Sequence, residues 1–268
     1  MTDEIVILGS GGGRHHIRTQ HRATGGILYK FNDIQAHIDP GPGAIVRINQ
    51  YQEDPVKTEL FIVTHGHVDH YSDLSAIIES SREILHDKNY GYFKKGTLIT
   101  THEVLKYISG YHLNMLKEVI KFKAGDKINY KDVEIIATKT VHSPSNEGFG
   151  VKFCLKDYSI AFTSDTMVFP GFSEEFSGCN ILVLNLLRPN SNLCKRHLCT
   201  DEVIPYLNKI DPPLFGLIIT HFGSFMDGPR STKNYVPSQV KKLHETTNIK
   251  NIVAAEDGLK ISIKELLK

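Results

Sequence analysis

The chain alternates between short apolar runs and turn residues, and this pattern limits the folds it can adopt more than any other feature. The runs are rich in Ile, Val, Leu and Phe: Ile5–Leu8, Gly26–Phe31, Leu60–Thr64, Val133–Ala137, Phe149–Leu155, Ser159–Thr163, Ile181–Leu186, Leu217–Thr220 and Ile252–Ala255. Runs of this length, bounded by Gly, Asp, Asn or Pro, are typical of strands. Lys156-Asp157 and Asp257-Gly258 have the composition of hairpin turns.

Helical patterns lie between the strand-like runs: Ser72–Ser81, a stretch within Thr101–Lys121, Thr200–Ile210 and Pro237–Thr246. Thr200 precedes two acidic residues, which is the pattern of a helix N-cap. Strands buried on both faces and interleaved with helices predict an α/β fold in layers. No linker or low-complexity tract divides the chain, so we expect a single domain over residues 1–268.

The composition excludes several classes of protein. The 268 residues include 31 basic and 30 acidic ones, and this balance argues against a generally basic protein that coats polyanions. The 4 cysteines form no Cys-x-x-Cys pair, which argues against a zinc ribbon or a thioredoxin-like motif. Neither a signal-peptide pattern nor an apolar run of about 18 residues is present. We expect a reduced, cytoplasmic protein without a membrane partner.

The motif Thr64-His65-Gly66-His67-Val68-Asp69-His70 directly follows an apolar run. Three imidazoles and a carboxylate this close together cannot all face one way from a regular strand or helix, but a turning loop lets them converge. These groups are ligands of Zn, Mn or Fe. The alternative is a polar surface loop that happens to be rich in histidine; we favour metal ligation.

Three further residues of ligand type stand where apolar runs end, namely His142, Asp165 and His221. Taken alone, a His or Asp at a strand end is more often a hydrogen-bonding or capping residue. Functional groups of α/β proteins nevertheless gather at strand ends. Together with the first loop, these positions predict one metal centre.

The order of these residues resembles the signature of the metallo-β-lactamase fold superfamily, which is His-x-His-x-Asp-His followed by a His, an Asp and a final His. The match extends over nearly the whole chain and includes Ile38-Asp39-Pro40-Gly41, which corresponds to the family's Asp-x-Gly. The resemblance implies a four-layer αββα sandwich with two divalent metal ions at one edge of its sheets. Zn is the first expectation, with Mn or Fe as alternatives.

By this resemblance, three imidazoles hold one metal ion: His65, His67 and His142. A carboxylate and two imidazoles hold the second: Asp69, His70 and His221. Asp165 would bridge the two ions, and Asp39 would orient a ligand imidazole from behind. A hydroxide that bridges two cations is a nucleophile at neutral pH, and the cations clamp the attacking and leaving oxygens. The resemblance therefore implies a hydrolase.

Two positions separate the chain from other branches of the superfamily. His67 stands where the flavin-linked di-iron reductases carry a Glu, which argues against redox chemistry. Asp165 stands where the best-known antibiotic-hydrolysing subclass has a cysteine, which argues against β-lactamase activity.

Three segments resemble the phosphodiesterase branch, which contains RNase Z and the phosphoribosyl cyclic phosphate phosphodiesterase: Ile5–Arg14, Arg196–Thr200 and Ala255–Ile261. The branch implies cleavage of a phosphodiester in RNA or in a cyclic or small molecule. Asp69 would orient or deprotonate the water, and His197 would stabilise or protonate the departing oxygen. Residues 143–164 leave no room for the long tRNA-gripping arm of many RNase Z enzymes, and the cysteine cluster of the cyclic phosphodiesterase is absent, so neither named activity follows. A homodimer is compatible with the resemblance.

The segment Gly9–Arg14 lacks both the Lys-Ser/Thr of a P-loop and the glycine spacing of a dinucleotide-binding loop. We therefore favour a tight loop whose amides face an anion over a nucleotide-cofactor site. Arg14 and Arg18 belong to a basic cluster after this loop. The cluster is either a solvated surface or a patch that steers phosphate to the metals.

Two rival functions remain. A thioester or lactone hydrolase, glyoxalase-II-like or lactonase-like, would share the seven ligands but has no use for His197 or the basic cluster. A non-catalytic binding module of the same fold would be expected to lose ligands, and this set is complete. Cys194 and Cys199 flank His197 and could form half of a separate zinc site; their spacing is unusual for one, so we assign His197 to the metal centre.

Overall fold

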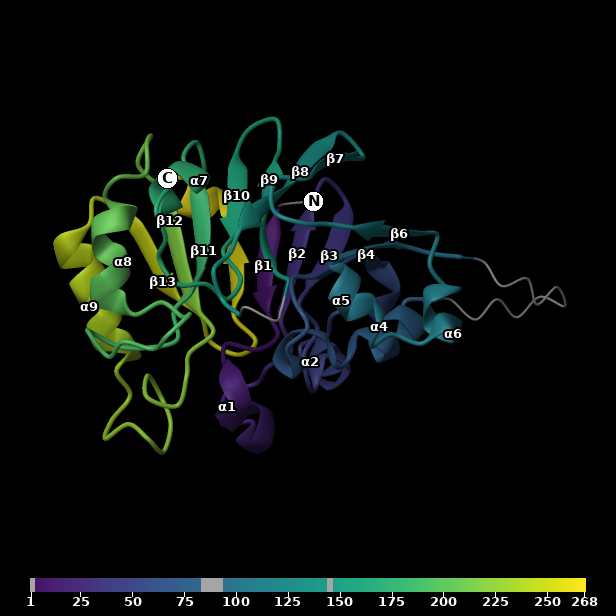
Figure 1. The fold of residues 1–268 in the computed structure, drawn as a ribbon, viewed down its shortest axis with the longest axis horizontal. Helices are drawn as coiled ribbons and strands as arrows, with labels where there is room; N and C mark the ends of the chain where they lie inside the picture. The colour runs from purple at the N-terminus through teal and green to yellow at the C-terminus, as the bar shows by residue number, and fades with distance from the viewer. Residues whose placement is uncertain (1–2, 83–93, 144–146) are drawn as a thin grey trace, which may run out of the picture.

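The computed structural model describes residues 3–82, 94–143 and 147–268. Two seven-stranded sheets pack face to face, and helices cover their outer faces (Figure 1). This arrangement confirms the expected four-layer αββα sandwich. No helix in the described ranges is long and apolar enough to cross a bilayer.

The first sheet has the order β14-β1-β2-β3-β4-β5-β6. Its strands are β14 (Lys260–Ser262), β1 (Glu4–Ile7), β2 (Ile27–Phe31), β3 (Ile34–Ile38), β4 (Thr58–Val63), β5 (Thr97–Thr100) and β6 (Glu118–Lys121). The second sheet has the order β13-β12-β11-β10-β9-β8-β7. Its strands are β13 (Asn251–Ala254), β12 (Gly216–Thr220), β11 (Ile181–Asn185), β10 (Ser159–Phe162), β9 (Phe149–Cys154), β8 (Val133–Lys139) and β7 (Lys127–Tyr130).

The two sheets repeat one topology. When each sheet is followed from one edge, β14 in the first and β7 in the second, the first three strand pairs are antiparallel and the last three are parallel. β3 and β10 thus occupy equivalent places in their sheets. Asp39 directly follows β3 and has φ 53°, and Asp165 follows β10 after Ser164, which has φ 55°. The repeat brings both carboxylates to the same edge of the sandwich.

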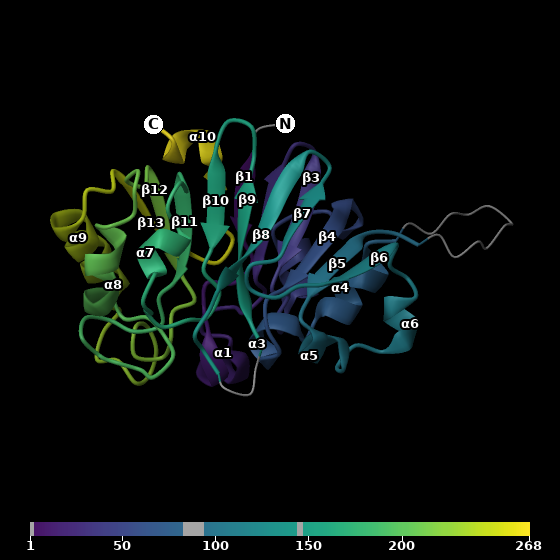
Figure 2. The same ribbon diagram turned by 45° about the horizontal axis from the view of Figure 1, so that its top comes forward.

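The helices form the two outer layers and part of one edge. Against the first sheet lie α2 (Ala44–Gln50), α4 (Leu74–Ser80), α5 (His102–Leu105) and α6 (Gly110–Leu113). Against the second lie α7 (Phe172–Glu175), α8 (Thr200–Leu207) and α9 (Val236–Thr246). The remaining helices are α1 (Gly13–Thr19), α3 (Val68–Tyr71), α10 (Ile263–Leu266) and the 3₁₀ turn η1 (Pro55–Lys57). Figure 2 shows α1, α3 and α5 side by side along the lower edge.

The interface between the sheets is aromatic. The ring of Tyr29 packs against Phe31, Phe153 and Phe162 at centroid distances of 4.6, 5.1 and 5.7 Å. Its buried hydroxyl lies 2.7 Å from that of Tyr158, so the polar atom has a partner inside the core. This dense packing fixes the spacing of the two sheets and hence of the loops at their edges.

The structure confirms the nine predicted strands within a residue or two and the Lys156-Asp157 turn, which joins antiparallel β9 and β10. Asp257-Gly258 does form a turn, but it connects β13 to β14 in the other sheet, so the predicted hairpin is wrong. The predicted N-cap is also wrong by one residue. Cys199 is the N-cap of α8, and the buried Thr200 hydroxyl has no partner among the described residues.

Candidate metal centre

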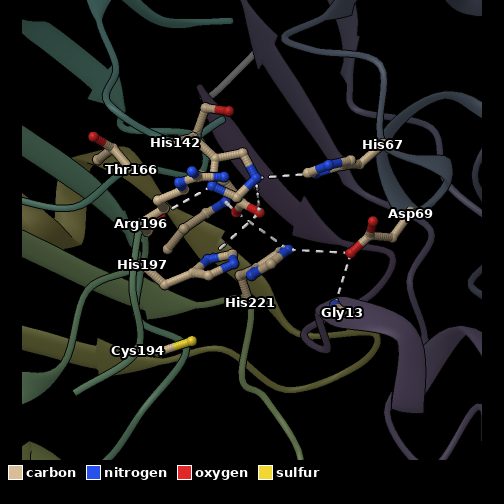
Figure 3. A network of polar contacts seen from close by, with 12 residues as sticks. Gly13, His67, Asp69, His142, Thr166, Cys194, Arg196, His197 and His221 are labelled. Carbon is tan, nitrogen blue, oxygen red and sulfur yellow. Dashed lines mark hydrogen bonds and ion pairs between the residues drawn. The ribbon is translucent and has the colours of Figure 1, made fainter. Parts of the chain in front are cut away.

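The proposed ligands meet at the edge where the parallel strands of both sheets end. His65 follows β4, His142 lies beyond β8, and Asp165 and His221 follow β10 and β12. The loop after β4 turns into the short helix α3, which carries Asp69 and His70. Figure 3 shows the side chains of His67, His142, His197 and His221 pointing toward a common centre.

Four side chains form the first group of donors: His65, His67, His142 and Asp165. The Nδ1 atom of His67 lies 2.9 Å from Nε2 of His65 and 3.0 Å from Nε2 of His142. His142 Nε2 is 3.7 Å from Oδ2 of Asp165. Three imidazole nitrogens turned toward one another can share a cation more readily than they can all share protons.

The second group is Asp69, His70 and His221. Oδ2 of Asp69 lies 3.8 Å from His70 Nε2 and 3.5 Å from His221 Nε2. Asp165 faces this group too, with Oδ2 3.6 Å from His70 Nε2 and Oδ1 3.3 Å from His221 Nε2. Asp165 therefore stands between the two groups.

Buried imidazole nitrogens without a hydrogen-bond partner indicate whether the site fits a metal ion. The Nε2 atoms of His70 and His221 are buried and make no hydrogen bond to the described residues. Leaving a buried polar atom unpaired costs about 1–3 kcal/mol, so such atoms are usually explained by a ligand or a water. Imidazole nitrogens and carboxylate oxygens are the donors that divalent Zn, Mn and Fe accept. The site fits divalent metal ions.

Asp39 lies behind His70. Its Oδ2 accepts from His70 Nδ1 at 2.8 Å and from the Thr64 hydroxyl at 2.8 Å, while Oδ1 accepts from the Thr64 amide at 2.7 Å. Burial lowers the pKa of His70, but the carboxylates of Asp39, Asp165 and Asp69 outweigh it and raise that pKa well above its usual value. The hydrogen bond to Asp39 directs Nε2 of His70 into the centre.

Backbone and amide groups orient other ligands. His142 Nδ1 donates to the carbonyl oxygen of Arg196 at 2.9 Å, so its Nε2 presents a lone pair to the centre. Asn185 Nδ2 donates to Oδ1 of Asp165 at 2.9 Å. Burial opposes ionisation of Asp165, yet the surrounding imidazoles, His221 foremost, hold the pKa of this carboxyl well below its usual value.

The glycine loop contacts the protein, which corrects one expectation in part. The amides of Gly11 and Gly12 donate to the carbonyls of Ala23 and Phe222 at 2.9 and 3.0 Å. Gly13 is the one of these three whose amide meets an anion, and that anion is Oδ2 of Asp69 at 2.7 Å (Figure 3). The expectation of amides that face an anion therefore holds for Gly13, where the anion is a candidate ligand of the protein itself, whereas Gly11 and Gly12 face carbonyls.

His197 lies on the loop before α8 with its side chain toward the centre (Figure 3), and it belongs to neither group of donors. Its Nδ1 lies 3.7 Å from Oδ2 of Asp165, and its ring is 4.6 Å from that of His142. Burial lowers the pKa of His197 to about 4. Among the described residues no group of ligand side chains includes a cysteine, so the alternative of a separate zinc site around Cys194 and Cys199 gains no support.

Arg14 and Arg18 are exposed and lie one turn apart on α1. The hydrogen bond from the Gly13 amide to Oδ2 of Asp69 fixes that helix beside the centre. Arg22, from the same cluster, has a structural role. Its guanidinium is paired with Asp227 at 2.7 Å. No signal in the sequence assigned the Arg196 carbonyl, the Asn185 side chain or the Gly13 amide to the particular side chain that each one contacts.

Comparison with known proteins is consistent with this geometry. A family model described as the β-lactamase superfamily domain matches residues 36–222. An uncharacterized protein of Methanocaldococcus jannaschii is 34% identical over 266 residues, which are 98% of this chain and 96% of that protein. A ribonuclease Z of Thermococcus gammatolerans is 25% identical over 150 residues, 56% of this chain and 46% of that enzyme.

Solved structures share the fold at low identity. The metallo-β-lactamase fold protein YhfI of Bacillus subtilis has a TM-score of 0.77 and 15% identity, covering 97% of this chain and 99% of its own. The short form of human tRNase Z has a TM-score of 0.71 and 14% identity, covering 97% and 99%. A diphosphatase from the PhnP family has a TM-score of 0.69 and 18% identity, covering 97% and 98%. On this evidence, the chain belongs to the β-lactamase superfamily domain family and has the metallo-β-lactamase fold.

Proposed function

We propose that this protein is a binuclear metal-dependent phosphodiesterase, acting as one domain over residues 1–268 on RNA or on a cyclic or small phosphodiester. Ribonuclease Z, tRNase Z and a diphosphatase are among the proteins that it resembles, and each name is that of an enzyme that cleaves a phosphate linkage. The observation that carries the proposal is His197, an imidazole inside the centre but outside both donor groups.

The two donor groups would each hold one divalent ion, with Zn expected first, and Asp165 would contact both. When bound, such ions supply a water of lowered pKa and positive charge beside the attacked phosphorus. The seven ligands come from both sheets, so the sandwich itself sets the separation of the two groups.

Asp69 would orient the attacking water. Burial opposes its ionisation, but His70 and His221 hold the pKa of this carboxyl well below its usual value, so it stays an anion at neutral pH. The Gly13 amide fixes its Oδ2 at 2.7 Å. A fixed acceptor beside the centre costs no reorganisation when the water attacks.

His197 would serve the departing oxygen. With a pKa of about 4 its imidazole is neutral at pH 7 and keeps one N–H that can donate a hydrogen bond. A phosphodiester anion beside it would raise that pKa again and favour proton donation to the leaving group. A thioester, whose thiolate departs without a proton, needs this residue less.

Arg14 and Arg18 would attract the substrate. Both guanidinium groups are exposed on α1, and neither has an ion-pair partner among the described residues. Exposed cations at the mouth of a site raise the encounter rate with anionic substrates, and salt screens the effect.

A substrate panel tests the proposal. Metal-loaded protein is assayed with bis(p-nitrophenyl) phosphate and with thioester, lactone and β-lactam probes. We expect turnover of the phosphodiester and none of the β-lactam. Thioester or lactone hydrolysis without phosphodiesterase activity would assign the protein to the glyoxalase-II-like or lactonase-like alternative instead.

A further inference from the structure

An aromatic side chain with no part in the chemistry above lies against the metal-binding loop. Tyr107, just beyond α5, is 50% exposed. A Cβ atom on Gly66 would lie 3.1 Å from Cε2 of Tyr107. Gly66 separates the ligands His65 and His67, so the ring of Tyr107 sits directly beside the first donor group.

The ring is held in place on one side and open on the other. Tyr71 of α3 stacks on it with a centroid distance of 5.2 Å and an interplanar angle of 16°. The Tyr107 hydroxyl donates to Oε1 of Glu103 at 3.2 Å. Because Tyr71 covers one face and the residue is still half exposed, the other face is available to solvent or to a ligand. A fixed aromatic ring loses little entropy when a ligand stacks on it.

The groups around Tyr107 indicate which class of ligand would stack on its ring. α5, which ends two residues before Tyr107, and α1 lie on either side of α3 (Figure 2), so Tyr107 and the exposed Arg14 and Arg18 come from opposite sides of the metal loop. Nucleotides combine a flat base with an anionic phosphate, and proteins bind single nucleotides and strands by pairing cationic groups with aromatic stacking. A phosphodiester with only alkyl groups would leave the ring unused.

We propose that Tyr107 is a stacking platform for a nucleobase, which makes nucleoside phosphodiesters the substrate class of the site. The proposal rests on the phosphodiesterase function proposed above. Tyr107 would select substrates by binding the base next to the scissile phosphate, and it takes no part in bond cleavage.

Two substrates with the same leaving group test the platform: thymidine 5′-(p-nitrophenyl phosphate) and methyl p-nitrophenyl phosphate. Tyr107→Ala should raise KM for the thymidine ester about tenfold, change its kcat little and leave the kinetics of the methyl ester unaltered. Tyr107→Phe should retain the wild-type KM, because stacking needs the ring and not the hydroxyl. Tyr111→Ala is the matched control, since Tyr111 on α6 is 57% exposed and packs against His112.

Equal effects of Tyr107→Ala on both esters, or no effect on either, would overturn the platform while the phosphodiesterase proposal stands. If the wild-type protein hydrolyses neither ester, the phosphodiesterase proposal is wrong. Calorimetric titration of the metal-loaded protein with thymidine 5′-monophosphate then decides the platform separately. Weaker binding by Tyr107→Ala than by wild type supports it, and equal affinity rules it out.

Discussion

His197 is the residue that distinguishes the proposed phosphodiesterase from the thioester or lactone hydrolase. Its ring lies within reach of Asp165 and His142 but outside both donor groups. Proton donation or hydrogen bonding to a leaving group contributes about 10²–10⁴ in rate. His197→Ala should therefore lower kcat by about that factor on a phosphodiester with an alkoxide leaving group, and by much less on a p-nitrophenyl ester, which needs no proton.

Metal content separates this effect from a structural one. His197→Ala should keep the wild-type metal content, measured by plasma mass spectrometry, because His197 is not among the proposed ligands. His244→Ala, on the exposed side of α9, is the control and should match wild type in both measurements. An unaltered rate on the alkoxide substrate would show that His197 is a bystander.

Candidate ligand residues were predictable one by one because side chains of distinctive chemistry follow apolar runs. His142, Asp165 and His221 each stand where a run ends, and the structure brings them together with the His-rich loop. The groups that orient them were not predictable. The Arg196 carbonyl and the Gly13 amide are backbone atoms that every sequence possesses, and their positions depend on loops far away in the chain.

Strands were predictable where they form a run of apolar residues, and strands that lack such a run were missed. β6 and β7 are edge strands of four residues, and neither contains an apolar run long enough to mark it as a strand. β3 is fully buried but contains Gln35 and His37, whose side chains donate to Thr58 Oγ1 and to the Gly25 carbonyl inside the protein. Internal hydrogen bonds of this kind allow polar residues in a buried strand, and a pattern of apolar residues cannot reveal them.

The stretch within Thr101–Lys121 shows the opposite error. It contains helical spacing, but only the single turns α5 and α6 form, and its last residues are strand β6. The β5–β6 pairing wins because it extends the sheet, whereas one helical turn gains little without tertiary packing.

The packing of the glycine loop against the residue that follows β12 predicts that a substitution at Gly12 lowers the metal content. A Cβ on Gly12 would lie 2.2 Å from ring atoms of His221, so Gly12→Ala must displace that ligand. We expect the variant to bind about one metal equivalent fewer than wild type, as measured by plasma mass spectrometry. The comparison variant is Gly110→Ala, which lies on α6 outside the glycine loop and whose added Cβ meets nothing within 4 Å, so it should keep the wild-type metal content. Full metal content in Gly12→Ala would contradict this role of the loop.

For the molecule as a whole, the core contains imidazoles that folding keeps neutral. Burial lowers the pKa of His37 to about 4, against 6.5 for an ordinary histidine. Between these two values the unfolded chain binds a proton that the folded chain does not, so protonation favours unfolding. The free energy of unfolding should therefore fall with decreasing pH from 6.5 to 4, by at most about 1.4 kcal/mol per pH unit for this residue.

Urea denaturation of the metal-free protein across this pH range measures the slope. His37→Gln, which keeps a donor for the Gly25 carbonyl, should flatten it relative to wild type. The exposed His244→Gln should leave it unchanged. Identical slopes for the two variants would show that His37 does not contribute.

The two sheets repeat one topology, and the seven proposed ligands come from both of them, so the centre exists only when the whole sandwich is assembled. The most direct test is the number of metal equivalents per chain after chelation and reconstitution, measured together with phosphodiesterase activity. Wild type should approach two equivalents, and Asp165→Ala should lose metal and activity together, because the Asp165 carboxylate lies within 3.7 Å of imidazole nitrogens from both donor groups. A wild-type protein that is fully active with one equivalent would contradict the binuclear centre.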